Sequence, residues 1–268
     1  MLTIPASKQE TITLDDKEFF FLAGILGSDR LLGVKDPFSG YLTEEIALEW
    51  ESAKTSLLEK NYLILEDTGE LSIPPEVFSR VAVAGLAERA CWLKYEHLGT
   101  SFEGYLHVVG DQVIQVCKCG VNDQQYALTE LGTVESTCQR LVNDLALSEA
   151  PLGEIPALLL SRKEFSDIFT SSATASGDAI ADRLAKLTDD AEGSLALAKC
   201  MKNKVSSGEL QLSVWNEYRW ESQNAAFISD ESMCWLLRMS LQGDQDWLTA
   251  APATREHFYQ MLMMWLKQ

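Results

Sequence analysis

The sequence predicts an α+β protein built from two related halves. Its composition is that of a folded globular chain, with 46% hydrophobic and 23% charged residues. Segments with helical periodicity are followed by segments in which apolar residues alternate with a period of two. This order of helices and then strands occurs twice along the 268 residues, a length that allows a sizeable buried core.

The first half opens with two predicted helices. Thr13 and the acidic residues after it suit the start of a helix that runs from about Leu14, because the helix dipole favours negative charge there. Gly27 suits its end. A second helix is predicted from Thr43 to about Lys60, burying apolar residues at helical intervals, namely Ile46, Trp50, Ala53, Leu57 and Leu58.

A hairpin and a third helix follow. Apolar segments flank Asp67-Thr68-Gly69, which predicts a turn, and Pro74-Pro75 opens a helix to about Arg89. The order helix, helix, hairpin, helix is that of a winged-helix-like unit. Its second helix is acidic, whereas a helix that reads a DNA groove needs basic residues. We therefore interpret the unit as an interaction or structural module.

The rest of the first half predicts an antiparallel meander and a helix. From Cys91 to Leu128 the period is two, with turns at Gly110-Asp111 and Gly120 to Asp123, which predicts about three strands. Thr133 to Leu147 then predicts an amphipathic helix.

The second half repeats this plan. Lys163-Glu164-Phe165 matches Lys17-Glu18-Phe19, and Trp247-Leu248-Thr249 falls 120 residues after Ala127-Leu128-Thr129. Asp178 to Met201 is strongly helical, Leu210 to Trp220 alternates, and a terminal helix is predicted over about Ala253 to Leu266. We interpret this as duplication, with halves 1–150 and 151–268 joined by Ser148 to Pro156 and with both meanders in one sheet about a pseudo-twofold axis. The alternative is that two unrelated segments share a common local arrangement.

Charge and hydropathy limit the class of partner. The net charge of −18 repels polyanions and anionic lipid surfaces, so we expect no nucleic acid and no membrane as ligand. The chain has no apolar run long enough to cross a bilayer, and its N-terminus lacks the pattern of a secretory signal. A cytoplasmic protein whose six cysteines are reduced and mostly buried is the expectation. The oligomeric state is left open.

No catalytic, cofactor-binding or metal-binding set stands out. The chain lacks a nucleophile elbow and a Gly-rich phosphate loop, and its three histidines show no zinc-binding spacing. Cys117 and Cys119 lie one residue apart, so both thiols face one side of a strand and could share a ligand with His107 on the adjacent strand. We favour a structural role for these cysteines and expect no enzyme, while an enzyme of unknown class built around these three residues stays an alternative.

Aromatic residues are the candidates for contact with a partner. Trp215 and Trp220 are an odd number of residues apart, so in a regular strand they point to opposite faces, and one of them is a candidate for an exposed aromatic anchor at an interface. Core packing is the alternative role for each tryptophan. Together with Phe227 and Phe102 they form the predicted partner-binding set.

The layout resembles a known family. Leu14 to Gly27 resembles the opening of the EspG family of ESX (type VII) secretion-associated proteins. Leu57 to Leu63, the hairpin at Asp67 to Gly69, the helix from Pro75 and a terminal helix introduced by Pro252-Ala253-Thr254 extend the similarity. The loop Gly33 to Tyr41 and the polar stretch Thr170 to Gly177 depart from it.

This resemblance implies a quasi-twofold fold with a central antiparallel sheet flanked by two helical subdomains. It also implies a cytosolic, non-catalytic chaperone that binds helical secretion substrates of the PE–PPE type and keeps them soluble. A regulatory protein containing the winged-helix-like unit is the second alternative to this function.

Overall fold

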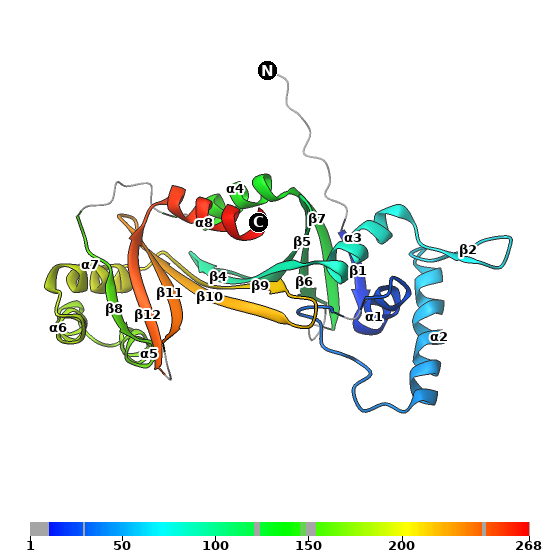
Figure 1. Cartoon of the computed structure of the whole chain (residues 1–268), viewed down its shortest axis with the longest axis horizontal. Helices are drawn as coiled ribbons and strands as arrows, with labels where there is room; N and C mark the ends of the chain where they lie inside the picture. The colour runs from blue at the N-terminus through cyan, green and yellow to red at the C-terminus, as the bar shows by residue number, and fades with distance from the viewer. Residues whose placement is uncertain are drawn as a thin grey trace, which may run out of the picture. The chain divides into compact units, whose positions relative to one another are not determined.

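The computed structural model describes residues 11–28, 30–120, 124–145, 147, 154–242 and 245–267. The chain is an α+β protein with one large antiparallel sheet and a separate two-stranded sheet (Figure 1). Parts of the predicted turn at Gly120 to Asp123 and of the predicted connector Ser148 to Pro156 lie outside the described residues.

The chain divides into two compact units, which interleave in sequence. The first unit comprises Met1–Trp92, Gly104–Val134 and Val214–Arg219. The second comprises Leu93–Glu103, Glu135–Ser213 and Trp220–Gln268. The division of the sequence at residue 150 stays a prediction.

The elements of the first half appear in an order that the second half repeats. They are β1 (Thr11–Asp15), α1 (Asp16–Ile25), α2 (Thr43–Glu59), β2 (Ile64–Leu65), β3 (Leu71–Ser72), α3 (Pro75–Leu86), β4 (Arg89–His97), β5 (Thr100–Val109), β6 (Gln112–Cys119), β7 (Gln125–Thr133) and α4 (Val134–Asp144). The meander therefore has four strands, one more than the alternating pattern indicated.

The second half contains one strand, three helices, four strands and a helix in the same order, without a counterpart of the small hairpin. They are β8 (Leu158–Ser161), α5 (Arg162–Ser171), α6 (Gly177–Thr188), α7 (Ala191–Lys202), β9 (Ser206–Trp215), β10 (Trp220–Ser229), β11 (Cys234–Gln242), β12 (Gln245–Ala253) and α8 (Arg255–Lys267). The strand order β1-β7-β6-β5-β4-β9-β10-β11-β12-β8 reads the same from either end once β8 is matched to β1 and β9–β12 to β4–β7. The predicted α+β class with two related halves is confirmed.

The first helix begins later than the sequence indicated. Thr13 lies in β1, which pairs with β7, and the N-cap of α1 is Asp15. The Asp15 carboxylate accepts a hydrogen bond from the backbone N–H of Glu18, whose carboxylate in turn accepts one from the N–H of Asp15. This reciprocal pair satisfies two N–H groups that a helix start leaves unpaired.

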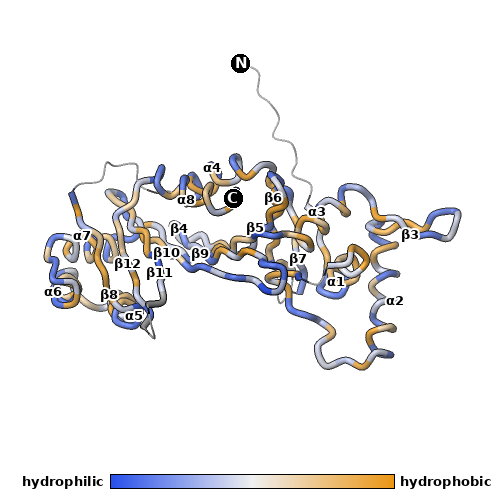
Figure 2. The backbone as a smooth tube through the Cα atoms, viewed as in Figure 1, coloured by the Kyte–Doolittle hydropathy of each residue, from blue (hydrophilic) through white to orange (hydrophobic). Residues whose placement is uncertain are grey.

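Helix α2 is less buried than its periodicity predicted. Ala53 and Leu57 are buried, whereas Ile46, Trp50 and Leu58 are only partly buried. Figure 2 shows hydrophilic and hydrophobic residues alternating along this helix. The apolar residues near its start thus contribute less to the core than their helical spacing predicted.

The segment 178–201, which has continuous helical periodicity, forms two helices. Asp189 adopts a left-handed conformation, with φ of 55°, at the end of α6, and the side chain of Asp190 caps the start of α7. A chain reversal at these two aspartates lets α6 and α7 pack side by side.

Each unit has its own core. In the first unit, α1, α2 and α3 pack against one face of β1, β6 and β7. In the second unit, α5, α6 and α7 pack against one face of β8, β10, β11 and β12. Ala226 and Ile228 belong to this core, so Phe227 between them faces the other side, where its ring centroid lies 5.5 Å from that of Phe258 of α8.

Candidate protein-binding groove

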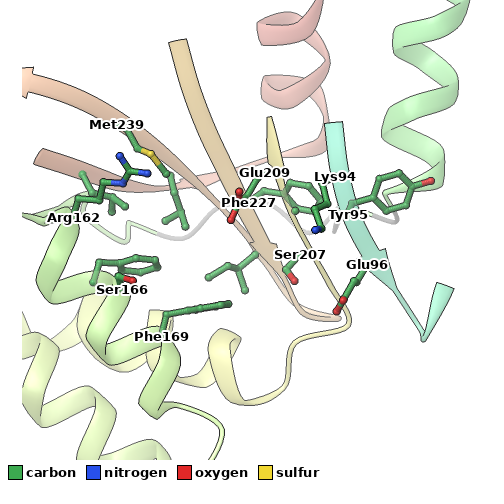
Figure 3. A pocket seen from close by; sticks show the side chains of 15 residues that line it. Lys94, Tyr95, Glu96, Arg162, Ser166, Phe169, Ser207, Glu209, Phe227 and Met239 are labelled. Carbon is green, nitrogen blue, oxygen red and sulfur yellow. The ribbon is translucent and has the colours of Figure 1, made fainter. Parts of the chain in front are cut away.

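A groove of about 300 Å³ lies within the second unit, between α5 and the sheet (Figure 3). Its lining comes from α5 and from five strands, and consists of Lys94, Tyr95, Glu96, Arg162, Phe165, Ser166, Phe169, Ser207, Gly208, Glu209, Phe227, Ile228, Leu237, Met239 and Leu248. More of the exposed lining is apolar than polar, as is usual for sites that bind organic or peptide ligands.

Two phenylalanines of α5 form one wall of the groove. Phe165 and Phe169 are four residues apart, so they lie on the same face of the helix, and their rings stack with centroids 6.0 Å apart. The Nζ atom of Lys204 lies 5.3 Å from the centre of the Phe169 ring. This cation–π contact adds to the packing of Phe169 against the core, and the ring stays partly exposed.

Charged side chains of both signs surround the apolar surface. Arg162 at the start of α5 approaches Asp246 at 3.8 Å, and Lys94 pairs with Glu103 at 3.2 Å. Glu96 and Glu209 extend from β4 and β9 beside them (Figure 3). An apolar surface with a mixed polar rim is the usual anatomy of a protein-binding patch.

Gly208 permits the close packing of strands next to the groove. A Cβ atom at this position would lie 2.6 Å from the carbonyl oxygen of Lys94 and 2.6 Å from a ring carbon of Phe227. Neither the backbone nor a fully buried ring can yield by that amount, so only glycine fits. Gly208 lies just before the segment Leu210 to Trp220, for which alternation was predicted, so it was not recognised as part of a strand.

Comparison with known proteins supports the fold. No family model matches the chain, and no curated protein matches it. Among solved structures, the chain is similar to EspG5 in the structure of the Mycobacterium tuberculosis type VII secretion system chaperone EspG5 in complex with a PE25–PPE41 dimer. The two share 12% sequence identity over 96% of each chain, with a TM-score of 0.61. This chain has the EspG5 fold. The fold that the family resemblance implied is thereby confirmed.

Two of the predicted partner-binding residues lie in the second unit. Phe227 lines the groove but is almost fully buried, packed between β9 and α8. Phe102 is partly exposed and stacks on Tyr95 with ring centroids 5.4 Å apart. Only Tyr95 of this stacked pair reaches the groove lining. The contact role predicted for these residues stays a prediction.

The two predicted tryptophans do not share a strand. Trp215 ends β9 and Trp220 begins β10, with a turn over residues 216–219 between them, so the opposite-face argument does not apply. Both rings are partly exposed, and the guanidinium of Arg30 lies 5.5 Å from the Trp215 ring. Tyr218 in the turn is 85% exposed and was missed, because nothing local distinguishes it from a packed aromatic residue.

The small hairpin of the first unit is a further apolar surface. Ile64, Leu65 and Leu71 on β2 and β3 are all exposed, with Leu65 at 59%. A two-stranded hairpin with exposed leucines gains little from folding alone, so these side chains are available to a partner.

The proposed grouping of His107 with Cys117 and Cys119 is wrong. His107 is paired with Ile114 in the β5–β6 register, so both point to the face of the sheet that α1, α2 and α3 cover. Cys117 and Cys119 alternate with Val116, which points to that same face, so the two cysteines point to the other face. Within the described part of the chain, no three His, Cys, Asp or Glu side chains are placed to hold a metal ion.

The cysteines are free and mostly buried. All six are free thiols and four are buried, which confirms that most of them lie inside. Burial raises the pKa of the Cys117 thiol to about 11 and that of Cys234 to about 12. Thiols with such pKa values are poor nucleophiles near neutral pH.

No helix among the described residues has both the length and the apolar character needed to cross a bilayer.

Proposed function

We propose that this chain is a non-catalytic chaperone or adaptor of a type VII-like secretion system, which binds a helical partner protein and keeps it soluble in the cytosol. The observation that carries the proposal is the fold shared with EspG5 along nearly the whole chain. That protein is described as a type VII secretion system chaperone and was solved with a PE25–PPE41 dimer. The groove of the second unit provides an apolar surface suited to this task.

The groove favours a helix end or an amphipathic helix as its occupant. Phe165, Phe169 and Met239 form an apolar strip that can receive side chains spaced at i, i+3 and i+4. Lys94 and Arg162 on the rim can pair with carboxylates of the partner, while Glu96 and Glu209 can pair with its basic residues. Such rim charges select the partner and its register more than they add affinity.

The acidic character of the chain suits a chaperone. A net charge of −18 opposes self-association of the free chain, so it can carry a partner with exposed apolar residues without precipitating. The same charge disfavours nucleic acid and anionic membranes as ligands.

The test is a pull-down from the native cell followed by binding measurements with the protein recovered. Ser166 is exposed and lines the groove, so Ser166→Arg introduces a bulky charge there without disturbing the core. Thr170 is exposed on the same helix outside the groove, so Thr170→Arg is a control with the same charge change. We expect Ser166→Arg to weaken binding about 100-fold, the loss of one to two central contacts, and Thr170→Arg to leave it unchanged.

Two outcomes contradict the proposal. Recovery of a tightly held metal or metabolite, with no specific protein, favours the enzymatic alternative. Equal binding by both variants removes the groove as the contact surface.

A further inference from the structure

We propose that the second unit has another docking surface, on the face of its sheet opposite the groove, which receives an amphipathic helix with acidic side chains. The surface consists of Leu159, Trp247, Thr249, Arg238 and Ser240, and is called here the outer patch. It lies on β8, β11 and β12 and shares no residue with the groove.

The strand register places the outer patch on one face. Leu158, Leu160 and Leu248 point into the core formed with α5, α6 and α7, so the residues alternating with them point away from it. Leu159 is paired with Thr249, which is paired with Arg238, and this forms one row across three strands. Trp247 is paired with Ser240 in the next row, diagonal to both Leu159 and Arg238.

The patch exposes large apolar side chains beside a cation. Leu159 lies on the edge strand β8 and is 54% exposed, and the Trp247 ring is partly exposed. Arg238 is exposed and forms no ion pair with another described residue. Exposed apolar residues at a sheet edge favour unwanted association, so a folded protein keeps them where a partner covers them.

The first half supplies an internal comparison. The 120-residue offset matches Trp247 to Ala127 on β7. Leu159 corresponds to a threonine on β1. It is Thr13 if Lys163 is matched to Lys17, and Thr11 if the pairing of β8 with β12 is matched to that of β1 with β7. Both threonines lie on the same face of β1, and the hydroxyl of Thr11 lies 2.9 Å from that of a threonine on β7. The fold therefore does not require a large apolar residue at either place, and the second half departs from the pattern at two neighbouring positions.

The arrangement around the patch favours a helix as its occupant. Helix α8 already packs on this face, with Phe258 against Phe227, and Phe227 and its strand partner Leu236 are both buried. The next rows carry Arg238 and Trp247, so a helix beside α8 would extend an existing layer. The unpaired Arg238 favours a partner helix that carries a carboxylate next to its apolar stripe. The patch thus differs from the chain as a whole, whose net charge of −18 favours basic partners.

Two synthetic peptides test this inference. Both are helices of about 18 residues with the same leucine stripe, long enough to be helical in water, and their flanking residues are all Glu in one and all Lys in the other. Affinity is measured by fluorescence anisotropy at about 0.15 M salt, where long-range attraction to the acidic chain is screened. We expect the Glu peptide to bind at least about tenfold more tightly than the Lys peptide, because only the Glu peptide can pair with Arg238.

Variants assign the binding to the outer patch. Trp247→Ala with Leu159→Thr installs the residue types of the first half, so the fold is retained while binding of the Glu peptide is lost. Arg238→Glu, an exposed change, reverses the preference between the peptides. Both peptides are measured on the Ser166→Arg background, in which the groove is blocked, so the binding that remains is binding to the outer patch. Failure here is then distinguishable from failure of the proposed function.

Three results overturn the inference. One is a preference of the native chain for the Lys peptide, and another is unchanged peptide binding by the double variant. The third is a dimer of the native chain that the double variant dissociates, because the occupant is then a second copy.

Discussion

The Oε2 atom of Glu18 lies 2.6 Å from the Nζ atom of Lys60, and the Glu18 side chain has no exposed surface. The same carboxylate accepts hydrogen bonds from the Ser56 hydroxyl at 2.7 Å and from the backbone N–H of Asp15 at 2.8 Å. A buried charge is tolerated only when it is paired and hydrogen-bonded in this way. The cluster joins the end of β1, the start of α1 and the end of α2.

Removal of the cation from this cluster should destabilise the first unit. Lys60→Met leaves a buried carboxylate without its counter-ion, and we expect a loss of about 3 kcal/mol in the free energy of unfolding. Urea denaturation measures the change. Lys54→Met is the matched control, because Lys54 pairs with the exposed Glu51 at 3.5 Å and should cost less than about 0.5 kcal/mol. Equal effects of the two variants would contradict the importance assigned to burial.

His107 should make the stability depend on pH. It is fully buried, stacks on Tyr105 with ring centroids 5.9 Å apart, and neither ring nitrogen has a hydrogen-bond partner in the described structure. Burial lowers the pKa of His107 from 6.5 to about 4, because the charged form loses its hydration. Between about pH 6.5 and pH 4, His107 is therefore neutral in the folded chain and protonated in the unfolded chain.

The sign of the effect follows from this lowered pKa. The free energy of unfolding carries no cost from His107 above pH 6.5. As the pH falls toward 4 the unfolded chain gains a proton that the folded chain does not, and the free energy of unfolding falls by about 3 kcal/mol. His107→Leu removes the titrating group, so its free energy of unfolding should fall less than that of the native chain over this range. Urea denaturation at several pH values measures both curves, and parallel curves would rule out a buried neutral histidine.

Gly208→Ala should disturb the strands beside the groove. The added methyl group meets the Lys94 carbonyl and the Phe227 ring at 2.6 Å, which we expect to cost about 2–3 kcal/mol in stability, seen as a lower thermal midpoint. Gly177→Ala is the control, since the nearest atom to its added methyl, on Lys202, is 3.8 Å away. A Gly208→Ala variant with native stability would show that β4 and β9 are less closely packed than described.

The cysteines should differ sharply in reactivity. Cys117 and Cys119 are partly exposed, whereas Cys91, Cys138, Cys200 and Cys234 are buried. Iodoacetamide at about pH 8 should therefore modify the native chain at Cys117 and Cys119 alone. Cys117 should react slowly, because burial raises the pKa of its thiol to about 11. Mass spectrometry after modification in urea should find all six labelled. Rapid native labelling of Cys200 would contradict the packing of α7 on the sheet.

Much of the element order could be predicted because its signals are local. The Asp67–Gly69 turn, the helix after Pro74-Pro75 and the 120-residue offset between Leu128 and Leu248 each depend on neighbouring residues or on simple repetition. Strand β1 was missed because it pairs with β7, where the partner of Thr11 lies 118 residues further along the chain. A strand of five residues directly before a helix looks, in the sequence, like the first turn of that helix.

The candidate sites depended on contacts that no local pattern carries. The groove brings Phe169 of α5 next to Met239 of β11 and Lys94 of β4, from three separate parts of the sequence. Among the predicted partner-binding residues, only Phe227 lines it, and that side chain is buried.

By itself, the sequence determined the α+β class, the repeated order of elements and the acidic surface, because periodicity, turn residues and charge act over a few residues or over the whole composition. Only the tertiary structure decided which faces are covered. It placed His107 and Cys117 on opposite sides of the sheet, and it left Leu159 exposed and Trp247 partly exposed on a face where the first half carries threonine and alanine. The physical reason is that a strand's register and the helices that cover it are set by partners distant in sequence, and a shift of one residue exchanges the two faces.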